Sequence, residues 1–305
     1  MKPIYPVLLV FLFASTCSLA AEHAKYDQAD TTQTTVSPST EVGGNDAMPL
    51  SAFFGANNAF PLFANRFICE GAAGGDGMPV VFSHQIDTST LQAGDFRITR
   101  ADGSTGSLVC VTPMPALDVG EMRTILLIGE YGSAENQPVK VDIVGNLLSI
   151  DGSINFRDSS ATVIPMENGP TLIYSEIVPE SQWDLGKEQS SGRVFGAPGD
   201  GCPESTQQVV RVVWTGGVTK PGGGEIDDVE RIAYRVFIED DAGELTTISP
   251  FAVADLRDGD NNHELCLDTT AKPVRVEFPA GLMTDPIEDL NPATSISVTY
   301  TNKYE

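Results

Sequence analysis

The chain has 305 residues, of which 42 are acidic and 18 basic, and its formal net charge is −24. Such a surface repels nucleic acid and anionic membranes, so we expect neither as a partner. No stretch approaches the roughly 20 apolar residues that a membrane helix needs, so we expect no membrane span. The charge suits an extracellular protein, either as a solvated surface or as an attraction for cationic partners.

The N-terminus has the composition of a secretory signal peptide. Lys2 precedes an apolar run from Val7 to Ala14, and Ser18-Leu19-Ala20 is a small-x-small cleavage site. We therefore predict a signal peptide over residues 1–20 and a secreted, periplasmic or cell-surface location. A lipoprotein anchor at Cys17 is the alternative. Residues 21–45 are polar, rich in Thr and Ser and without hydrophobic period, which predicts a disordered leader.

A phenylalanine-rich segment follows over residues 48–68. Five Phe residues surround Gly55 and Pro61, and Pro61 argues against one continuous helix. Two interpretations remain open: a cover packed over the open end of a sandwich, or an exposed aromatic patch that binds a ligand.

The most informative stretch runs from Pro79 to Thr105. Residues 79–82 are β-branched and aromatic, and residues 95–99 alternate polar and apolar, which predicts two strands. Between them, Asp87, Ser89 and Thr90 favour turns closed by side-chain bonds to backbone N–H groups. Leu91 is expected to be an apolar plug beneath this loop.

Paired residues in this stretch resemble the bacterial Ig-like domain family of S-layer and other cell-surface proteins. The pairs that carry the resemblance are Phe82-Ser83, Ile86-Asp87, Thr90-Leu91 and Asp95-Phe96. They cover about thirty residues of the chain. The resemblance implies a β-sandwich in a secreted protein, and it brings no catalytic residues.

Further strands are predicted by short Val-, Ile-, Leu- and Thr-rich segments separated by turn residues. In the first half these are residues 107–111, 123–128, 139–144 and 161–165, and residues 171–178 are a strand of either half. In the second half they are residues 208–214, 231–238, 244–248, 264–267, 274–278 and 295–300. We predict an all-β protein with two Ig-like or fibronectin-like sandwich domains in tandem, over residues 46–178 and 179–305.

Four cysteines remain after the predicted signal peptide, and they permit three pairings. We predict the disulfides Cys69–Cys110 and Cys202–Cys266, because each pair then stays inside one predicted domain. Zinc is the alternative, but the chain has no Cys-x-x-Cys spacing and its three histidines are scattered.

The densest run of oxygen ligands lies over residues 255–263. Asp258, Asp260 and Asn262 stand at alternate positions, and calcium prefers six to eight oxygen ligands. We predict these three as a calcium site, which a second acidic turn over residues 285–291 would complete. The run is not an EF-hand, because His263 stands where the loop needs glycine. The other interpretation is a hairpin turn rich in Asp and Asn.

The sequence contains no nucleophile elbow, zinc-protease motif, dinucleotide turn or phosphate loop. We therefore favour a non-enzymatic structural or binding module that recognises an extracellular protein or glycan. The alternative is an extracellular carbohydrate hydrolase or lyase that uses acidic residues at a sandwich edge. Acidic residues are so abundant in this chain that the sequence singles out no particular pair.

Overall fold

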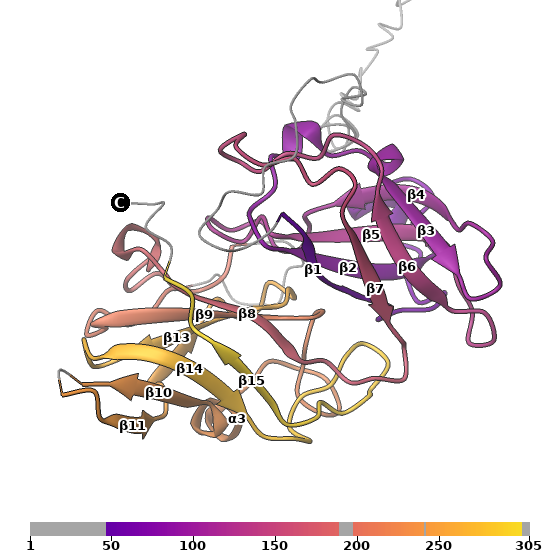
Figure 1. The fold of residues 1–305 in the computed structure, drawn as a ribbon. Helices are drawn as coiled ribbons and strands as arrows, with labels where there is room; N and C mark the ends of the chain where they lie inside the picture. The colour runs from indigo at the N-terminus through magenta and orange to yellow at the C-terminus, as the bar shows by residue number, and fades with distance from the viewer. Residues whose placement is uncertain (1–46, 189–197, 241, 301–305) are drawn as a thin grey trace, which may run out of the picture.

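The computed structural model describes residues 47–188, 198–240 and 242–300. The predicted signal peptide and leader lie outside these described residues. The described chain has far more strand than helix, which confirms the all-β prediction. Its strands form one seven-stranded sheet and two four-stranded sheets (Figure 1).

The first seven strands form the N-terminal sheet, in the order β3-β6-β7-β1-β2-β5-β4. Core side chains come from both ends of this order, Met78 and Leu127 from one end and Ile98 and Val141 from the other. The sheet therefore folds over on itself around one apolar core, like a sandwich. The strands are β1 (Pro49–Phe53), β2 (Asp76–Phe82), β3 (Phe96–Arg100), β4 (Ser107–Thr112), β5 (Thr124–Glu130), β6 (Pro138–Ile143) and β7 (Ser160–Ile164).

The phenylalanine-rich segment does not form one structure. Its start is β1, a central strand paired with β2 on one side and β7 on the other, and both Phe53 and Phe54 are fully buried. Its end is the short helix α2 (Ala64–Phe67), where Phe63 and Phe67 are more than half exposed. The segment thus contributes to the core as a strand and also leaves two rings at the surface.

The loop after β2 is closed as the sequence predicts. The 3₁₀ turn η1 (Thr88–Thr90) is capped by Asp87, whose Oδ1 accepts a hydrogen bond of 2.9 Å from the Ser89 N–H. Leu91 is fully buried in the core. A second 3₁₀ turn, η2 (Ala93–Asp95), leads into β3.

The remaining strands form two C-terminal sheets, an inner one and an outer one. The inner sheet has the order β12-β13-β9-β8 and lies nearer the N-terminal sheet, and the outer sheet has the order β11-β10-β14-β15 (Figure 1). The elements are β8 (Leu172–Ile177), η3 (Glu180–Gln182), β9 (Gln208–Trp214), α3 (Asp228–Ala233), β10 (Arg235–Glu239), β11 (Leu245–Ile248), β12 (Ala252–Ala254), β13 (Asn262–Leu267), β14 (Lys272–Phe278) and β15 (Thr294–Ser297).

The prediction of one strand over residues 231–238 is wrong in its first half, where the chain is in α3. Asp227 caps this helix by accepting a 3.0 Å hydrogen bond from the Val229 N–H, and Glu230 Oε2 accepts one of 2.9 Å from the Asp227 N–H. This reciprocal capping box favours a helix at residues that would otherwise suit a strand. Strand β10 begins only after it, at Arg235.

The two faces of the inner sheet have different roles. Val210, Val212 and Trp214 of β9 point into the core between the two C-terminal sheets. Because side chains alternate along a strand, Arg211 and Val213 lie on the opposite face. Val213 there packs against Val81 of β2, so this face is turned toward the N-terminal sheet.

Strand β8 is hydrogen-bonded to β9 and so belongs to the inner C-terminal sheet. The predicted boundary after residue 178 would leave this strand with the first half. The division of the chain into domains stays a prediction.

Both predicted disulfides are present. Cys69–Cys110 joins the segment after α2 to β4, and Cys202–Cys266 joins the segment before β9 to β13. Each closes its loop within one set of sheets, and in the chain-entropy model each stabilises the fold by about 4 kcal/mol.

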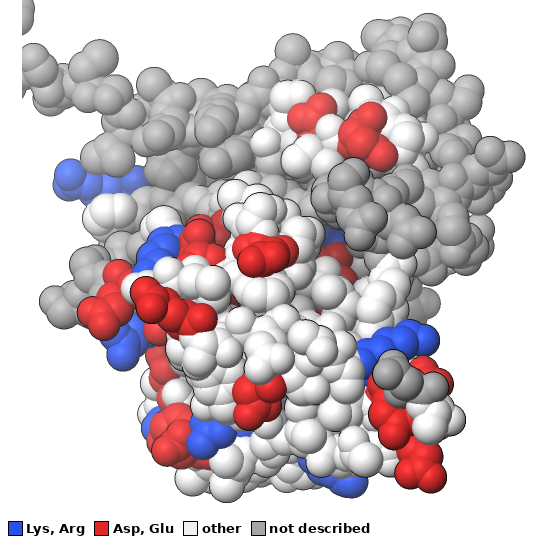
Figure 2. All heavy atoms as spheres, turned by 90° about the vertical axis from the view of Figure 1, so that its left-hand side faces the viewer, with Lys and Arg blue, Asp and Glu red and all other residues white. Residues whose placement is uncertain are grey.

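The charged side chains on the face in Figure 2 are spread over the surface. Asp and Glu stand among uncharged residues and a smaller number of Lys and Arg. No helix in the described residues is long and apolar enough to cross a membrane.

Candidate metal centre

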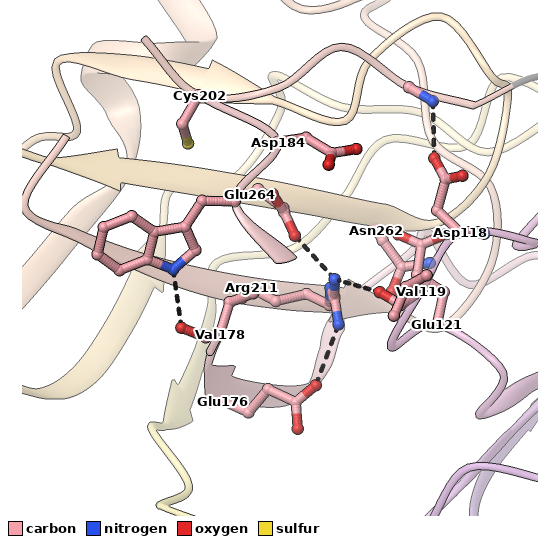
Figure 3. A network of polar contacts seen from close by, with 12 residues as sticks. Asp118, Val119, Glu121, Glu176, Val178, Asp184, Cys202, Arg211, Asn262 and Glu264 are labelled. Atoms are coloured by element: carbon pink, nitrogen blue, oxygen red, sulfur yellow. Dashed lines mark hydrogen bonds and ion pairs between the residues drawn. The ribbon is translucent and has the colours of Figure 1, made fainter. Parts of the chain in front are cut away.

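Charged residues are concentrated where the inner sheet faces the N-terminal sheet. Arg211 on β9 stands directly opposite Glu176 on β8 and Glu264 on β13 in the strand register. Its guanidinium lies 2.7 Å from Glu264 Oε1 and 3.4 Å from Glu176 Oε1 (Figure 3). The three side chains form a buried row across the sheet.

Two contacts join this row to the loop between β4 and β5, residues 113–123. Arg211 Nη2 donates a 3.1 Å hydrogen bond to the carbonyl of Val119 (Figure 3). Arg123 Nη2 lies 3.1 Å from Glu176 Oε2, and both side chains are buried. Two arginines and two glutamates thus neutralise one another at the junction.

The β4–β5 loop also carries two carboxylates beyond this balanced set. Its turn over residues 118–121 is tight, because Glu121 Oε2 accepts from the Asp118 N–H at 3.2 Å and the Glu121 N–H donates to the Asp118 carbonyl at 3.2 Å. Gly120 between them has a φ of 97°, which favours glycine. Asp118 Oδ2 further accepts a 2.7 Å hydrogen bond from the Gly199 N–H.

Two more carboxylates come from the loop between β12 and β13, residues 255–261. Asp255 and Arg257 adopt left-handed backbone conformations, with φ of 63° and 77°. Each costs about 1 to 2 kcal/mol in a residue other than glycine. Asp258 Oδ1 accepts a 3.1 Å hydrogen bond from the Asp260 N–H. The loop thus turns sharply within a few residues.

The two loops bring four carboxylates together. Asp118, Glu121, Asp255 and Asp258 each offer an oxygen, and these oxygens all lie within 4.8 Å of one another. Glu121 is fully buried, and Asp255 and Asp258 are 6% and 3% exposed. We call these four residues the acidic cluster.

Burial and mutual repulsion raise the pKa of the cluster carboxyls. Burial, followed by the charge of Asp260, raises the pKa of Glu121 well above its usual value. Burial and the neighbouring Glu121 do the same to the pKa of Asp255. The pKa of Asp258 is raised to about 8, mainly by burial and then by Asp255. The cluster is therefore unfavourable as a set of bare anions.

A small cavity borders the cluster. Its volume is about 180 Å³, and its lining includes Asp118, Asp184, Lys187, Arg211, Asp255 and Glu264. Lys187 is the cation on this lining besides Arg211, and it forms an ion pair with Asp184.

The predicted ligands Asp258, Asp260 and Asn262 are placed differently from one another. Asp258 lies in the acidic cluster, but Asp260 and Asn262 are not part of it. Asp260 Oδ1 accepts from the Asn262 N–H at 2.7 Å, and Asp260 Oδ2 accepts from Asn262 Nδ2 at 2.5 Å. In both bonds Asn262 donates and the Asp260 carboxylate accepts, as in a turn rich in Asp and Asn. A calcium site made of these three residues stays a prediction.

The second acidic turn, residues 285–291, is held by its own hydrogen bonds. Asp285 Oδ1 accepts from the Ile287 and Asp289 N–H groups at 3.0 and 2.9 Å. The Asn291 side chain bonds only backbone groups, among them the N–H groups of Leu282 and Met283. Neither side chain belongs to the acidic cluster.

Sequence reasoning missed Asp118, Glu121 and Asp255 as candidate ligands. Asp255 begins the acidic run that the sequence singled out, so a wider reading of that run would have included it. Asp118 and Glu121 lie far away along the chain and carry no local signal. Only the packing of the inner sheet against the N-terminal sheet brings them to the site.

Comparisons with known proteins give no family. No protein-family model matches the chain, and no curated protein matches it. Solved structures of the bacterial S-layer protein SbsC are similar in part. Its N-terminal part is 13% identical over 73% of this chain (TM-score 0.23), and rSbsC(31-844) is 10% identical over 85% (TM-score 0.28). Domains 1–6 of SbsC are 11% identical over 84% (TM-score 0.27).

The chain spans 41% of the length of each of these SbsC structures. TM-scores this low do not establish a shared fold, and the likeness carries no conclusion about what this chain does.

Proposed function

We propose that the protein is a secreted or cell-surface protein that acts as a structural or binding module and not as an enzyme. The observation that carries this proposal is the position of its most concentrated charges. These charges are buried between the N-terminal sheet and the inner C-terminal sheet. There, ion pairs between two arginines and two glutamates connect the two sets of sheets: Arg123 with Glu176, and Arg211 with Glu176 and Glu264. Charges placed in this way hold parts of the chain together.

The two disulfides support the proposed location. Structural disulfides form and persist in oxidising compartments such as the periplasm and the extracellular space. They fasten one loop in each set of sheets, which suits a protein that must stay folded outside the cell. The acidic surface favours an extracellular protein or glycan as the partner over a nucleic acid.

The alternative is a carbohydrate hydrolase or lyase that acts through the acidic cluster. Close carboxyls with raised pKa values are what such enzymes use, and Glu121 and Asp255 have this property. However, the bordering cavity of about 180 Å³ is smaller than the roughly 300 Å³ at which ligand pockets begin. Glu121 is also fully buried, so a sugar ring would have no room beside it.

The test is to incubate the purified protein with soluble polysaccharides and with insoluble cell-wall preparations. We expect the protein to sediment with a cell-wall preparation without releasing reducing ends or unsaturated sugars. Release of sugars by the wild type, and its loss in Glu121→Gln, would instead establish the hydrolase or lyase. Failure to sediment with any preparation, together with no release, would contradict a glycan-binding role.

A further inference from the structure

We propose that Asp118, Glu121, Asp255 and Asp258 bind one calcium ion that bridges the β4–β5 loop and the β12–β13 loop. Two of these ligands come from each loop, so the ion would join the N-terminal sheet to the inner C-terminal sheet. This inference does not rest on the proposed function.

Buried oxygens without partners are the first argument. Among the described residues, Glu121 Oε1 and Asp255 Oδ2 are buried and accept no hydrogen bond from an N–H or hydroxyl donor. The two carboxyls instead face each other, so only a proton shared between them or a cation could satisfy these oxygens. Leaving a buried acceptor unsatisfied costs about 1 to 3 kcal/mol, and more when the group is charged. Both side chains belong to the acidic cluster, and both are more than nine-tenths buried. A cation would satisfy both oxygens at once.

The local charge balance is the second argument. Arg123 and Arg211 are matched by Glu176 and Glu264, and Lys187 is matched by Asp184. The four cluster carboxylates come in addition to these pairs. Isolated buried charges are so costly that folded proteins protonate them, pair them or coordinate them to a metal. Protonation leaves the carboxyls neutral, whereas a metal lets them stay ionised. A divalent cation is the matching partner.

The donor set and its spacing select the type of cation. All four donors are carboxylate oxygens, which hard cations such as calcium and magnesium prefer and which softer metals accept less readily than nitrogen or sulfur. Calcium–oxygen distances are about 2.4 Å, so two ligands of one calcium lie at most about 4.8 Å apart. The cluster oxygens all lie within 4.8 Å of one another. Magnesium would need a tighter octahedron at about 2.1 Å.

The test uses the full chain purified in chelator and titrated with calcium chloride. We expect one calcium ion to bind per chain and the melting temperature to rise with calcium concentration. Hydrogen exchange should slow in both residues 118–121 and residues 255–260, because the ion contacts both loops. Slowing in one loop alone would overturn the bridge, and an unchanged melting temperature would overturn the site.

Three variants locate the ligands. Glu121→Gln and Asp258→Asn should each weaken calcium binding at least about tenfold. In chelator they should melt no lower than the wild type, because each removes one repelling charge; folding is thereby checked in the same experiment. Asp142→Asn on β6 is the matched surface control and should bind like the wild type.

Asp260→Asn separates the cluster from the ligand set predicted from the sequence. If Asp260→Asn abolishes calcium binding and Glu121→Gln leaves it unchanged, the ion binds to the β12–β13 loop alone and the bridge is wrong. If Glu121→Gln weakens binding more than Asp260→Asn does, the bridge is supported.

Discussion

Arg123 lies 3.1 Å from Glu176 Oε2 and joins the end of the β4–β5 loop to strand β8. The same guanidinium donates hydrogen bonds to the carbonyls of Phe82 and Ser83 and stacks 3.7 Å from the centre of the Tyr174 ring. One arginine thus contacts the end of β2 and two side chains of β8. This ion pair is therefore a main connection between the N-terminal sheet and the inner C-terminal sheet.

Glu176→Gln tests that connection. The variant leaves Arg123 without a counter-charge and removes one of the two partners of Arg211. Removing one member of a buried ion pair costs about 3 to 5 kcal/mol. We therefore expect the free energy of unfolding, measured in urea, to fall by this amount.

Asp142→Asn is the matched control for Glu176→Gln, because it makes the same change of charge at a surface pair. Asp142 lies 3.2 Å from Arg97 and 2.6 Å from Lys140, and these two cations are 55% and 49% exposed. Such pairs contribute about 0 to 1 kcal/mol. Equal losses in the two variants would show that the buried network does not hold the sheets together.

The two disulfides should differ in their reactivity in the folded protein. Cys202 and Cys266 are fully buried, whereas Cys69 and Cys110 are only partly buried. Thiol–disulfide exchange needs access of a thiolate to sulfur. A mild reductant followed by alkylation and peptide mapping should label Cys69 and Cys110 first. Earlier labelling of Cys202 and Cys266 would contradict this order.

The strands that alternate or that carry β-branched runs could be predicted from the sequence, because one face of each strand meets a core. Strand β1 could not, since it is central in its sheet and nearly all of its residues are buried. A strand buried on both faces shows no alternation of polar and apolar residues. Helix α3 was missed for a different reason. Its apolar residues suit a strand, and the capping box of Asp227 and Glu230 decides the structure.

The candidate site was only partly predictable. Asp258 stands in an acidic run that any reading of the sequence finds, and the structure places it in the acidic cluster. Glu121 stands with Asp118 in a loop of otherwise ordinary composition. Its role depends on how Arg211 draws the β4–β5 loop onto the inner sheet, and such a contact between distant segments has no period or spacing in the sequence.

Gly120 should be irreplaceable at the junction. Its φ is 97°, and a Cβ at this position would lie 2.2 Å from Arg211 Nη1. Gly120→Ala should therefore displace the guanidinium as well as strain the backbone. Gly103→Ala is the control, since Gly103 has a φ of 81° but nothing within 4 Å of its Cβ position. We expect the control to lose about 1 to 2 kcal/mol from backbone strain alone.

Urea unfolding of both glycine variants measures the difference. Gly120→Ala should lower the free energy of unfolding clearly more than the control does. It should also speed hydrogen exchange at residues 118–121. If the two variants lose the same amount, the contact with Arg211 has no energetic importance.

Asp285 should make the stability of the protein depend on pH. Burial raises its pKa to about 6, from a usual value of 3.8. Between about pH 4 and pH 6, the folded protein keeps a proton that the unfolded chain has released. The free energy of unfolding therefore falls as the pH rises through this window, by up to about 3 kcal/mol.

Asp285→Asn isolates this effect, because an amide oxygen can still accept from the Ile287 and Asp289 N–H groups but does not ionise. Its free energy of unfolding should match that of the wild type near pH 3.5 and exceed it at pH 7 to 8. Asp240 is the matched control, since its Oδ1 accepts from the Ala242 and Glu244 N–H groups in an exposed turn. Asp240→Asn should change stability less at pH 7 to 8. Urea unfolding at a series of pH values measures these free energies. If the free energies of unfolding of Asp285→Asn and the wild type differ by the same amount at every pH, Asp285 ionises freely in the folded protein.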